Sequence, residues 1–153
     1  MSVMKAKDLS RGAPRSPRVR IRDYAVLARA IDKCRAKLAG TLGEYHFNCP
    51  LDGALLAFKG ITADELEHVV ELGMKDEQIG LWLDEHGVLK TPEEILHWSD
   101  TMDAYSLMED PERRDYFIGE CQRLGLDPEH ATLFDMLEAD DAASFRTNGS
   151  ARG

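Results

Sequence analysis

Residues 61–73 read ITADELEHVVELG, and this stretch shows how the chain builds a helix. Thr62 and Glu65 have the spacing of a capping box, in which each side chain accepts a hydrogen bond from the other residue's backbone N–H. Gly73 is the residue type that most often ends a helix. The stretch therefore predicts a short amphipathic helix with a defined start and end. Its buried face would consist of Leu66, Val69 and Val70.

Similar start signals recur along the chain, at Asp76, Thr91-Pro92, Asp110-Pro111 and Asp127-Pro128, each followed by apolar residues at helical spacing. A further helix is predicted from Tyr24, ending near Gly40. No stretch shows the sustained alternation that is typical of a strand. The sequence therefore predicts an all-α fold, a compact single-domain bundle of six or seven helices. The cations opposite the apolar face of the helix predicted from Tyr24 are expected to point into water: Arg22, Arg29, Lys33 and Lys37.

The bundle is expected to have an irregular segment at each end. Residues 1–20 lack helical periodicity, and Pro14 and Pro17 keep the residues before them extended. They predict an extended basic N-terminal arm that packs on a helical domain of residues 21–138. Residues 139–153 lose periodicity and predict a flexible C-terminal tail.

The composition indicates a globular protein of the cytoplasm. The chain has 153 residues, of which 43% are apolar and 31% charged, enough for one domain with a hydrophobic core. No apolar run approaches the ~20 residues that cross a bilayer, and no apolar stretch follows the basic N-terminus as in a secretory signal. Three cysteines are too few and too scattered for a disulfide framework, so reduced thiols in the cytoplasm are expected.

Charge is distributed unevenly. The net charge is −9, yet residues 1–38 carry a net +8 and residues 39–153 a net −17. The acidic total disfavours nucleic acid as a partner, and the basic stretch RGAPRSPRVRIR has no recognition helix around it. Two interpretations remain open: the acidic body neutralises the arm, or some arginines bind an anionic ligand through their planar guanidinium groups.

The segment GTLGEYHFNCPLDG, residues 40–53, concentrates the polar chemistry of the chain. Cys49 precedes a predicted helix, a position that favours a nucleophilic thiolate. Tyr45 and His46 are the other weak catalytic candidates, because either can serve general acid–base chemistry. His46 and Cys49 have a spacing seen in metal sites, but no second pair completes four ligands, so neither a metal nor a cofactor is predicted. Equally, Asn48 and Asp52 are residues typical of turns and caps, and the segment can be a purely structural loop.

Several motifs carry a resemblance to a known family: Ser16-Pro17-Arg18, Asp32-Lys33, Leu38-Ala39-Gly40, Gly43-Glu44-Tyr45 and Asn48-Cys49-Pro50-Leu51-Asp52, with TPEEILHW and LFDMLE further on. Over residues 8–138 the chain resembles small bacterial proteins grouped as domain of unknown function 5069. The resemblance implies a compact helical cytoplasmic domain and implies no particular activity. It also implies that His46 lies at a variable position, often lysine, which argues against a mechanism that depends on His46.

Two hypotheses about function follow. In the first, a small anionic molecule binds where the arm, the first helix and residues 43–52 meet, with or without metal-free catalysis. Arg18, Arg20 and Arg35 would attract the anion, and Tyr45, Asn48 and Asp52 would orient it. In the second, the protein is a helical interaction module without chemistry, the same arginines pair with carboxylates of the chain, and the loop presents a surface to a protein partner. In neither hypothesis is a membrane involved.

Overall fold

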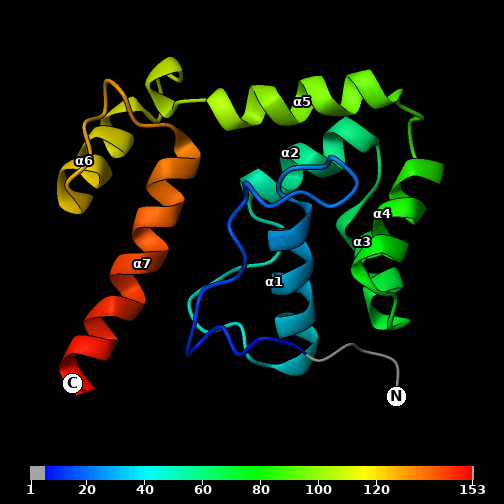
Figure 1. The fold of residues 1–153 in the computed structure, drawn as a ribbon, viewed down its shortest axis with the longest axis horizontal. Coiled ribbons are helices and arrows are strands. Elements are labelled where there is room, and N and C mark those ends of the chain that lie inside the picture. The colour runs from blue at the N-terminus through cyan, green and yellow to red at the C-terminus, as the bar shows by residue number, and fades with distance from the viewer. Residues whose placement is uncertain (1–5, 153) are drawn as a thin grey trace. The chain divides into compact units, whose positions relative to one another are not determined.

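The computed structural model describes residues 6–152, with the side chains of residues 6–145. Over these residues it contains seven α-helices, one short 3-10 helix and no strand, which confirms the predicted all-α fold (Figure 1). None of the described helices is long and apolar enough to cross a membrane. The elements are α1 (Leu27–Ala39), α2 (Pro50–Lys59), α3 (Ala63–Glu71), α4 (Asp76–Glu85), α5 (Pro92–Ala104), η1 (Leu107–Glu109), α6 (Arg114–Leu124) and α7 (Leu133–Arg152).

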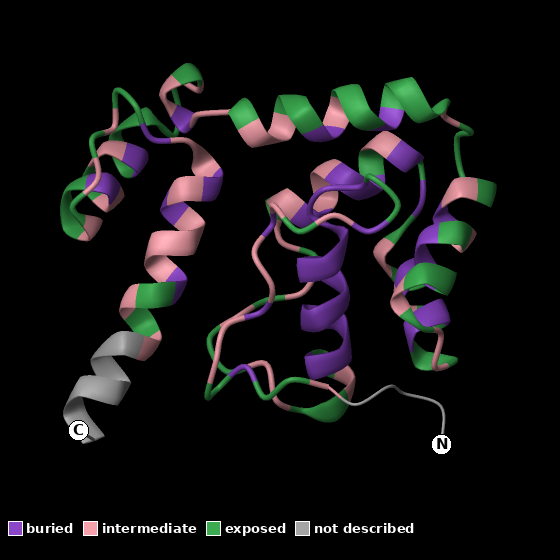
Figure 2. Cartoon of the chain, viewed as in Figure 1, coloured by how far each residue is buried: buried purple, intermediate pink, exposed green. Residues whose placement is uncertain are grey.

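The chain divides into two compact units, and the division falls inside α5, between Ser99 and Asp100. Helix α1 is the centre of the first unit and packs against α2, α3 and α4. Every residue from 27 to 36 is buried, charged residues included, so α1 is enclosed on all sides (Figure 2). An amphipathic helix on the surface would have kept one polar face in water.

Two of the four cations expected in water are therefore buried, and the prediction is wrong for them. Arg29 and Lys33 are only 4% and 3% exposed. Arg22 and Lys37 are exposed, as expected. The reason is tertiary: irregular chain on either side of α1 folds back over its cationic face, which helical periodicity alone does not reveal.

The N-terminal arm runs along α1 and is longer than expected. Leu9 is 1% exposed, and its backbone N–H donates to the carbonyl of Thr41 beyond the end of α1 at 2.9 Å. Helix α1 begins at Leu27 and not at Tyr24. The difference arises because Asp23 and Val26 have positive φ angles, 68° and 74°, which interrupt a right-handed helix.

Cap chemistry predicted the helix starts at Thr62 and Thr91 correctly. The capping box of Thr62 and Glu65 is formed in both directions, with hydrogen bonds of 2.8 and 3.1 Å. The start predicted at Asp110-Pro111 is wrong, because Asp110 caps only a turn and α6 begins at Arg114. The start predicted at Asp127 is also wrong, because Asp127 caps a single turn: it accepts a hydrogen bond from the backbone N–H of Glu129 and contacts Nδ1 of His130 at 2.6 Å. Helix α7 begins instead at Leu133, where a capping box formed by Thr132 and Asp135 precedes it.

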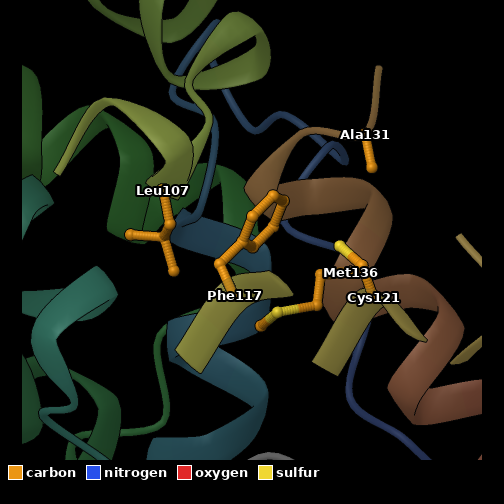
Figure 3. Close-up of a cluster of buried hydrophobic side chains, with 5 residues drawn as sticks. All are labelled: Leu107, Phe117, Cys121, Ala131 and Met136. Carbon is orange, nitrogen blue, oxygen red and sulfur yellow. The ribbon is translucent and has the colours of Figure 1, made fainter. Parts of the chain in front are cut away.

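The second unit has its own small core, drawn in Figure 3. Phe117 and Cys121 of α6 are fully buried there. Leu107 of η1, Ala131 of the loop before α7 and Met136 of α7 complete the buried cluster. Residues 139–152, predicted as part of an irregular tail, belong to α7. Arg123 of α6 holds this part of α7 through a 2.7 Å ion pair with Asp140. The flexibility of the segment stays a prediction, and residue 153 lies outside the described residues.

Candidate functional site

The arm and the segment after α1 meet, as the first hypothesis requires. Gly43 marks the closest approach: its φ angle is +59°, and a Cβ atom there would lie 2.7 Å from the carbonyl oxygen of Leu9. A side chain at residue 43 would therefore be strained and would collide with backbone. Glycine is needed at this position for the two segments to pack.

Residues 43–52 are referred to below as the corner. Three cations of α1, Arg29, Lys33 and Lys37, follow one another at intervals of four residues and so lie on one side of the helix. Each of them contacts at least one side chain of the corner. The guanidinium carbon of Arg29 lies 5.6 Å from the centre of the Tyr45 ring. Lys33 Nζ lies 3.1 Å from the Cys49 sulfur. Lys37 Nζ lies 5.9 Å from the centre of the Phe47 ring.

Lys33, Cys49 and Asp52 form the most unusual cluster in the first unit. Lys33 Nζ lies 2.9 Å from Asp52 Oδ2 and 3.1 Å from Cys49 Sγ. The side chains of Lys33 and Asp52 are 3% and 1% exposed, whereas Cys49 is half-buried. A buried ion pair thus lies directly beneath a half-buried cysteine.

Local structure explains how the cluster is held. Asp52 is the third residue of α2, and its Oδ2 accepts hydrogen bonds from the backbone N–H groups of Asn48, at 3.0 Å, and Cys49, at 3.3 Å. Asn48 has a φ angle of +66°, a conformation that asparagine tolerates better than most residues and that turns the chain into α2. Among the described residues, no donor forms a hydrogen bond with the other carboxylate oxygen, Asp52 Oδ1, although it is buried. The cap interpretation of Asp52 is therefore correct, but it accounts for only one oxygen of this carboxylate.

A second charged network fixes the arm to α1 and α4. Arg15 binds Asp32 of α1 in a bidentate way, at 3.1 and 3.0 Å, and also Asp76 of α4 at 2.7 Å. Arg35 pairs with the same Asp76 at 3.0 Å. Burial raises the pKa of Asp76, but the hydrogen bond and charge of Arg15, joined by Arg35, outweigh burial and hold this pKa below its usual value. This part of the basic arm is neutralised within the chain.

The predicted site residues thus fall into separate groups. Asn48, Cys49 and Asp52 come together at the start of α2. Tyr45 is half-buried against Arg29, and His46 is exposed. Arg35 belongs to the Asp76 network. Arg18 and Arg20 are half-buried in the arm, and their part in anion binding stays a prediction.

Sequence reasoning missed Lys33 as a site residue, together with Arg15 and Asp76 of the second network. The interval of four residues that links Arg29, Lys33 and Lys37 was visible, but it was assigned to water. The juxtaposition of Lys33 with Cys49 depends on how the corner folds back over α1, and no local pattern encodes that.

The other two cysteines lie in environments that suppress thiol reactivity. Burial raises the pKa of Cys34 to about 12, with the charge of Glu67 adding to it. Burial, with nearby carboxylates, also raises the pKa of Cys121. Since the thiolate is the reactive form, both residues are structural. Among the described residues, no group of three or more His, Cys, Asp or Glu side chains could hold a metal ion.

A cavity of about 440 Å³ is present in the first unit, lined by Arg22, Asp23, Glu77, Asp84, Lys90, Pro92 and Ile95. None of the predicted site residues lines it. The backbone beside it is strained, with φ angles of 48° at Arg22 and 68° at Asp23. Buried Ser99 fastens this turn, because its hydroxyl donates to the Asp23 carbonyl at 2.6 Å and accepts from Ala25 N–H at 2.8 Å.

Together these features define a small all-α protein in which a half-buried thiol lies against a buried lysine–aspartate pair. The chain belongs to the family described as domain of unknown function DUF5069, whose model matches residues 11–143. The match confirms the resemblance carried by the sequence motifs. No curated protein matches the chain.

Proposed function

We propose that the protein binds a small anionic molecule at the corner and reacts with it, without a metal, through the Cys49 thiolate. The observation that carries the proposal is the 3.1 Å contact of Cys49 Sγ with Lys33 Nζ, an ammonium group that is almost completely buried. Because Lys33 lies in the enclosed helix α1, it is held in place and does not need to be ordered when a ligand arrives.

The electrostatics of the corner support an anionic ligand. Three cations of α1 lie beneath it at intervals of four residues, and two of them have carboxylate partners, Asp52 for Lys33 and Glu67 for Lys37. The N-terminus of α2, a helix of ten residues, adds a partial positive charge at Cys49. These charges stabilise negative charge on the sulfur and on a molecule that approaches it. Arg18 and Arg20 of the arm remain proposed contributors, whereas Arg35 already has Asp76 as its partner.

The remaining predicted residues have roles in positioning. Asp52 keeps Lys33 in place and orders the turn before α2, so it supports the site from beneath. Tyr45 and the exposed side chain of Asn48 lie in the same short segment as Cys49 and would orient the ligand. A reducing cytoplasm suits this chemistry, because all three cysteines are free thiols.

The experiment compares alkylation of the three cysteines by a neutral reagent, iodoacetamide, and by its anionic analogue, iodoacetate. Peptide mass spectrometry gives a rate constant for each cysteine with each reagent. We expect Cys49 to react fastest with both. The ratio of the iodoacetate to the iodoacetamide rate at Cys49 should be higher in the folded protein than in the urea-unfolded chain, and should fall as salt is added.

Matched variants assign the effect to Lys33. Lys33→Met should lower the iodoacetate preference at Cys49 toward that of the unfolded chain. Lys75→Met removes the same charge from an exposed position at the start of α4 and should leave the preference unchanged. Equal labelling of all three cysteines, or a Cys49 that shows no preference for the anionic reagent, would exclude the proposal.

The alternative proposal is a helical interaction module without chemistry. The ion pair of Arg35 with Asp76 is the arrangement expected for it, since it matches one of the key arginines to a carboxylate of the chain. A Cys49 that labels no faster than Cys34 would favour this alternative. The two functions are therefore separated by the same labelling experiment.

A further inference from the structure

Lys33 and Cys49 place an amine beside a thiol in a geometry suited to a covalent bond between them. The two atoms are 3.1 Å apart, although they belong to residues sixteen positions apart in the chain. Lys33 cannot swing away, because its side chain is 3% exposed and Asp52 binds its ammonium group at 2.9 Å. Cys49 is half-buried, so a small oxidant reaches it from the solvent.

We propose that a peroxide oxidises Cys49 and that Lys33 then captures the oxidised sulfur in a reversible sulfur–nitrogen cross-link. The proposal rests on the reactive Cys49 thiolate of the proposed function, and adds a redox switch to it. Formation of the cross-link would consume the Cys49 nucleophile and remove the positive charge of Lys33 beneath it.

The first step is a two-electron oxidation of sulfur. The Cys49 thiolate attacks one oxygen of hydrogen peroxide, the O–O bond breaks, and the leaving hydroxide takes a proton from solvent to become water. The product is a sulfenic acid, Cys49 S–OH, which is the reversible first stage of cysteine oxidation and condenses with nearby nucleophiles.

The second step is a condensation without further oxidation. Lys33 passes one proton to the Asp52 carboxylate, and the resulting amine attacks the sulfur. A sulfur–nitrogen bond forms, the S–O bond breaks, and the hydroxyl group leaves as water with a second proton from the nitrogen. Asp52 suits the role of proton acceptor, because Oδ2 already contacts Lys33, and buried Oδ1 has no hydrogen-bond donor among the described residues.

The cross-link would join two separate parts of the fold covalently. Cys49 is the residue before α2, and Lys33 lies in the middle of α1, so the bond would tie the corner to the central helix. The bond would remove the Lys33 ammonium charge and the Cys49 thiolate charge together, so no free thiolate would remain at the corner. The oxidised protein should therefore bind no anionic reagent at Cys49 until a thiol reductant cleaves the bond.

The test uses the full chain with Cys34→Ala, because Cys34 is adjacent to Lys33 and a Cys34–Cys49 disulfide would have the same mass as the proposed cross-link. After treatment with hydrogen peroxide and digestion with trypsin without reductant, we expect the peptides of residues 30–35 and 38–59 to be joined, two hydrogens lighter than their sum. Trypsin should fail to cut after Lys33, and dithiothreitol should restore the separate peptides.

Other products have distinct meanings. Dimedone, which traps sulfenic acids, should lower the yield of the cross-link when it is present during oxidation of the same protein. In the Lys33→Arg variant dimedone should label Cys49 fully, because a guanidinium group does not capture the sulfur. A Cys49 sulfenic acid that dimedone traps but that never joins Lys33 would overturn the cross-link and leave the proposed function intact. A joined pair that retains an oxygen atom would overturn the condensation step. A Cys49 that peroxide does not oxidise would overturn both proposals.

Discussion

Replacing Lys33 with methionine tests the buried ion pair on which the site depends. Methionine keeps most of the apolar stem and removes the charge. Asp52 would retain its two backbone donors but lose the ammonium group 2.9 Å away, and its carboxylate is only 1% exposed. Breaking a buried pair by removing one partner costs ~3–5 kcal/mol. We therefore expect the free energy of unfolding of the first unit to fall by about this amount.

Urea denaturation followed by tryptophan fluorescence measures this change, because Trp82 and Trp98 both lie in the first unit. Lys37→Met is the matched control: it removes a cation from the same side of α1, but one that is exposed, and should have a far smaller effect. Adding Asp52→Leu to Lys33→Met should recover part of the loss, since no buried charge then remains unpaired. If Lys33→Met costs no more than the control, the pair is effectively solvated and the reasoning is refuted.

Three further predictions concern the framework of the site. Gly43→Ala should destabilise the first unit by ~1–3 kcal/mol, because residue 43 has a positive φ angle and a Cβ atom there would collide with backbone. Gly53→Ala, in an open helical position, should instead stabilise the unit by ~0.5–1 kcal/mol. Urea titrations that show equal effects would contradict this. Arg15→Met should destabilise the protein most at neutral pH and least below about pH 4. The reason is that the pKa of Asp76 is lowered in the folded protein, so its pairing with Arg15 stabilises the fold only while that carboxylate is ionised. A loss of stability that is independent of pH in acid titrations would disprove the linkage. Ser99→Ala should cost ~1–3 kcal/mol in thermal or urea unfolding, because the buried backbone N–H of Ala25 and the carbonyl of Asp23 lose their partner. An unchanged stability would show that water replaces the hydroxyl.

Local chemistry made much of the fold predictable. The capping boxes at Thr62 and Thr91 each place a hydroxyl and a carboxylate three residues apart, and both are formed in the structure. The start at Asp127 failed because aspartate before proline caps a turn as readily as a helix, and only the later box at Thr132 continues into α7. Cap signals therefore identify helices well but do not distinguish a helix from a single turn.

The site was predictable only in part. Cys49, Asn48 and Asp52 are close in sequence, so their cooperation at the start of α2 follows from local rules. Lys33 joins them through tertiary packing alone. A lysine on a cationic helix face is normally solvated, and the sequence does not reveal that the corner covers this face.

The arginines show the same limit. Arg35 was expected to attract an anion, but its partner is Asp76, forty-one residues further along the chain. Asp76 was interpreted as a helix cap, but at the start of α4 it is the Gln78 side-chain oxygen that accepts a hydrogen bond from the backbone N–H of Lys75. Asp76 is thereby available to bind Arg15 and Arg35. Ion pairs of this kind depend on which helices become neighbours, and local sequence patterns do not predict which helices do.

The position of the Lys33 ammonium group between Cys49 and Asp52 is the central claim, and NMR of the protein with isotopically labelled lysine tests it most directly. A buried, hydrogen-bonded ammonium exchanges its protons slowly, so Lys33 should give a protected side-chain resonance that Lys33→Met removes. Cys49→Ser and Asp52→Asn should each shift this resonance, and Cys34→Ala should not. A Lys33 resonance that exchanges as fast as those of exposed lysines, or that ignores both substitutions, would contradict the account.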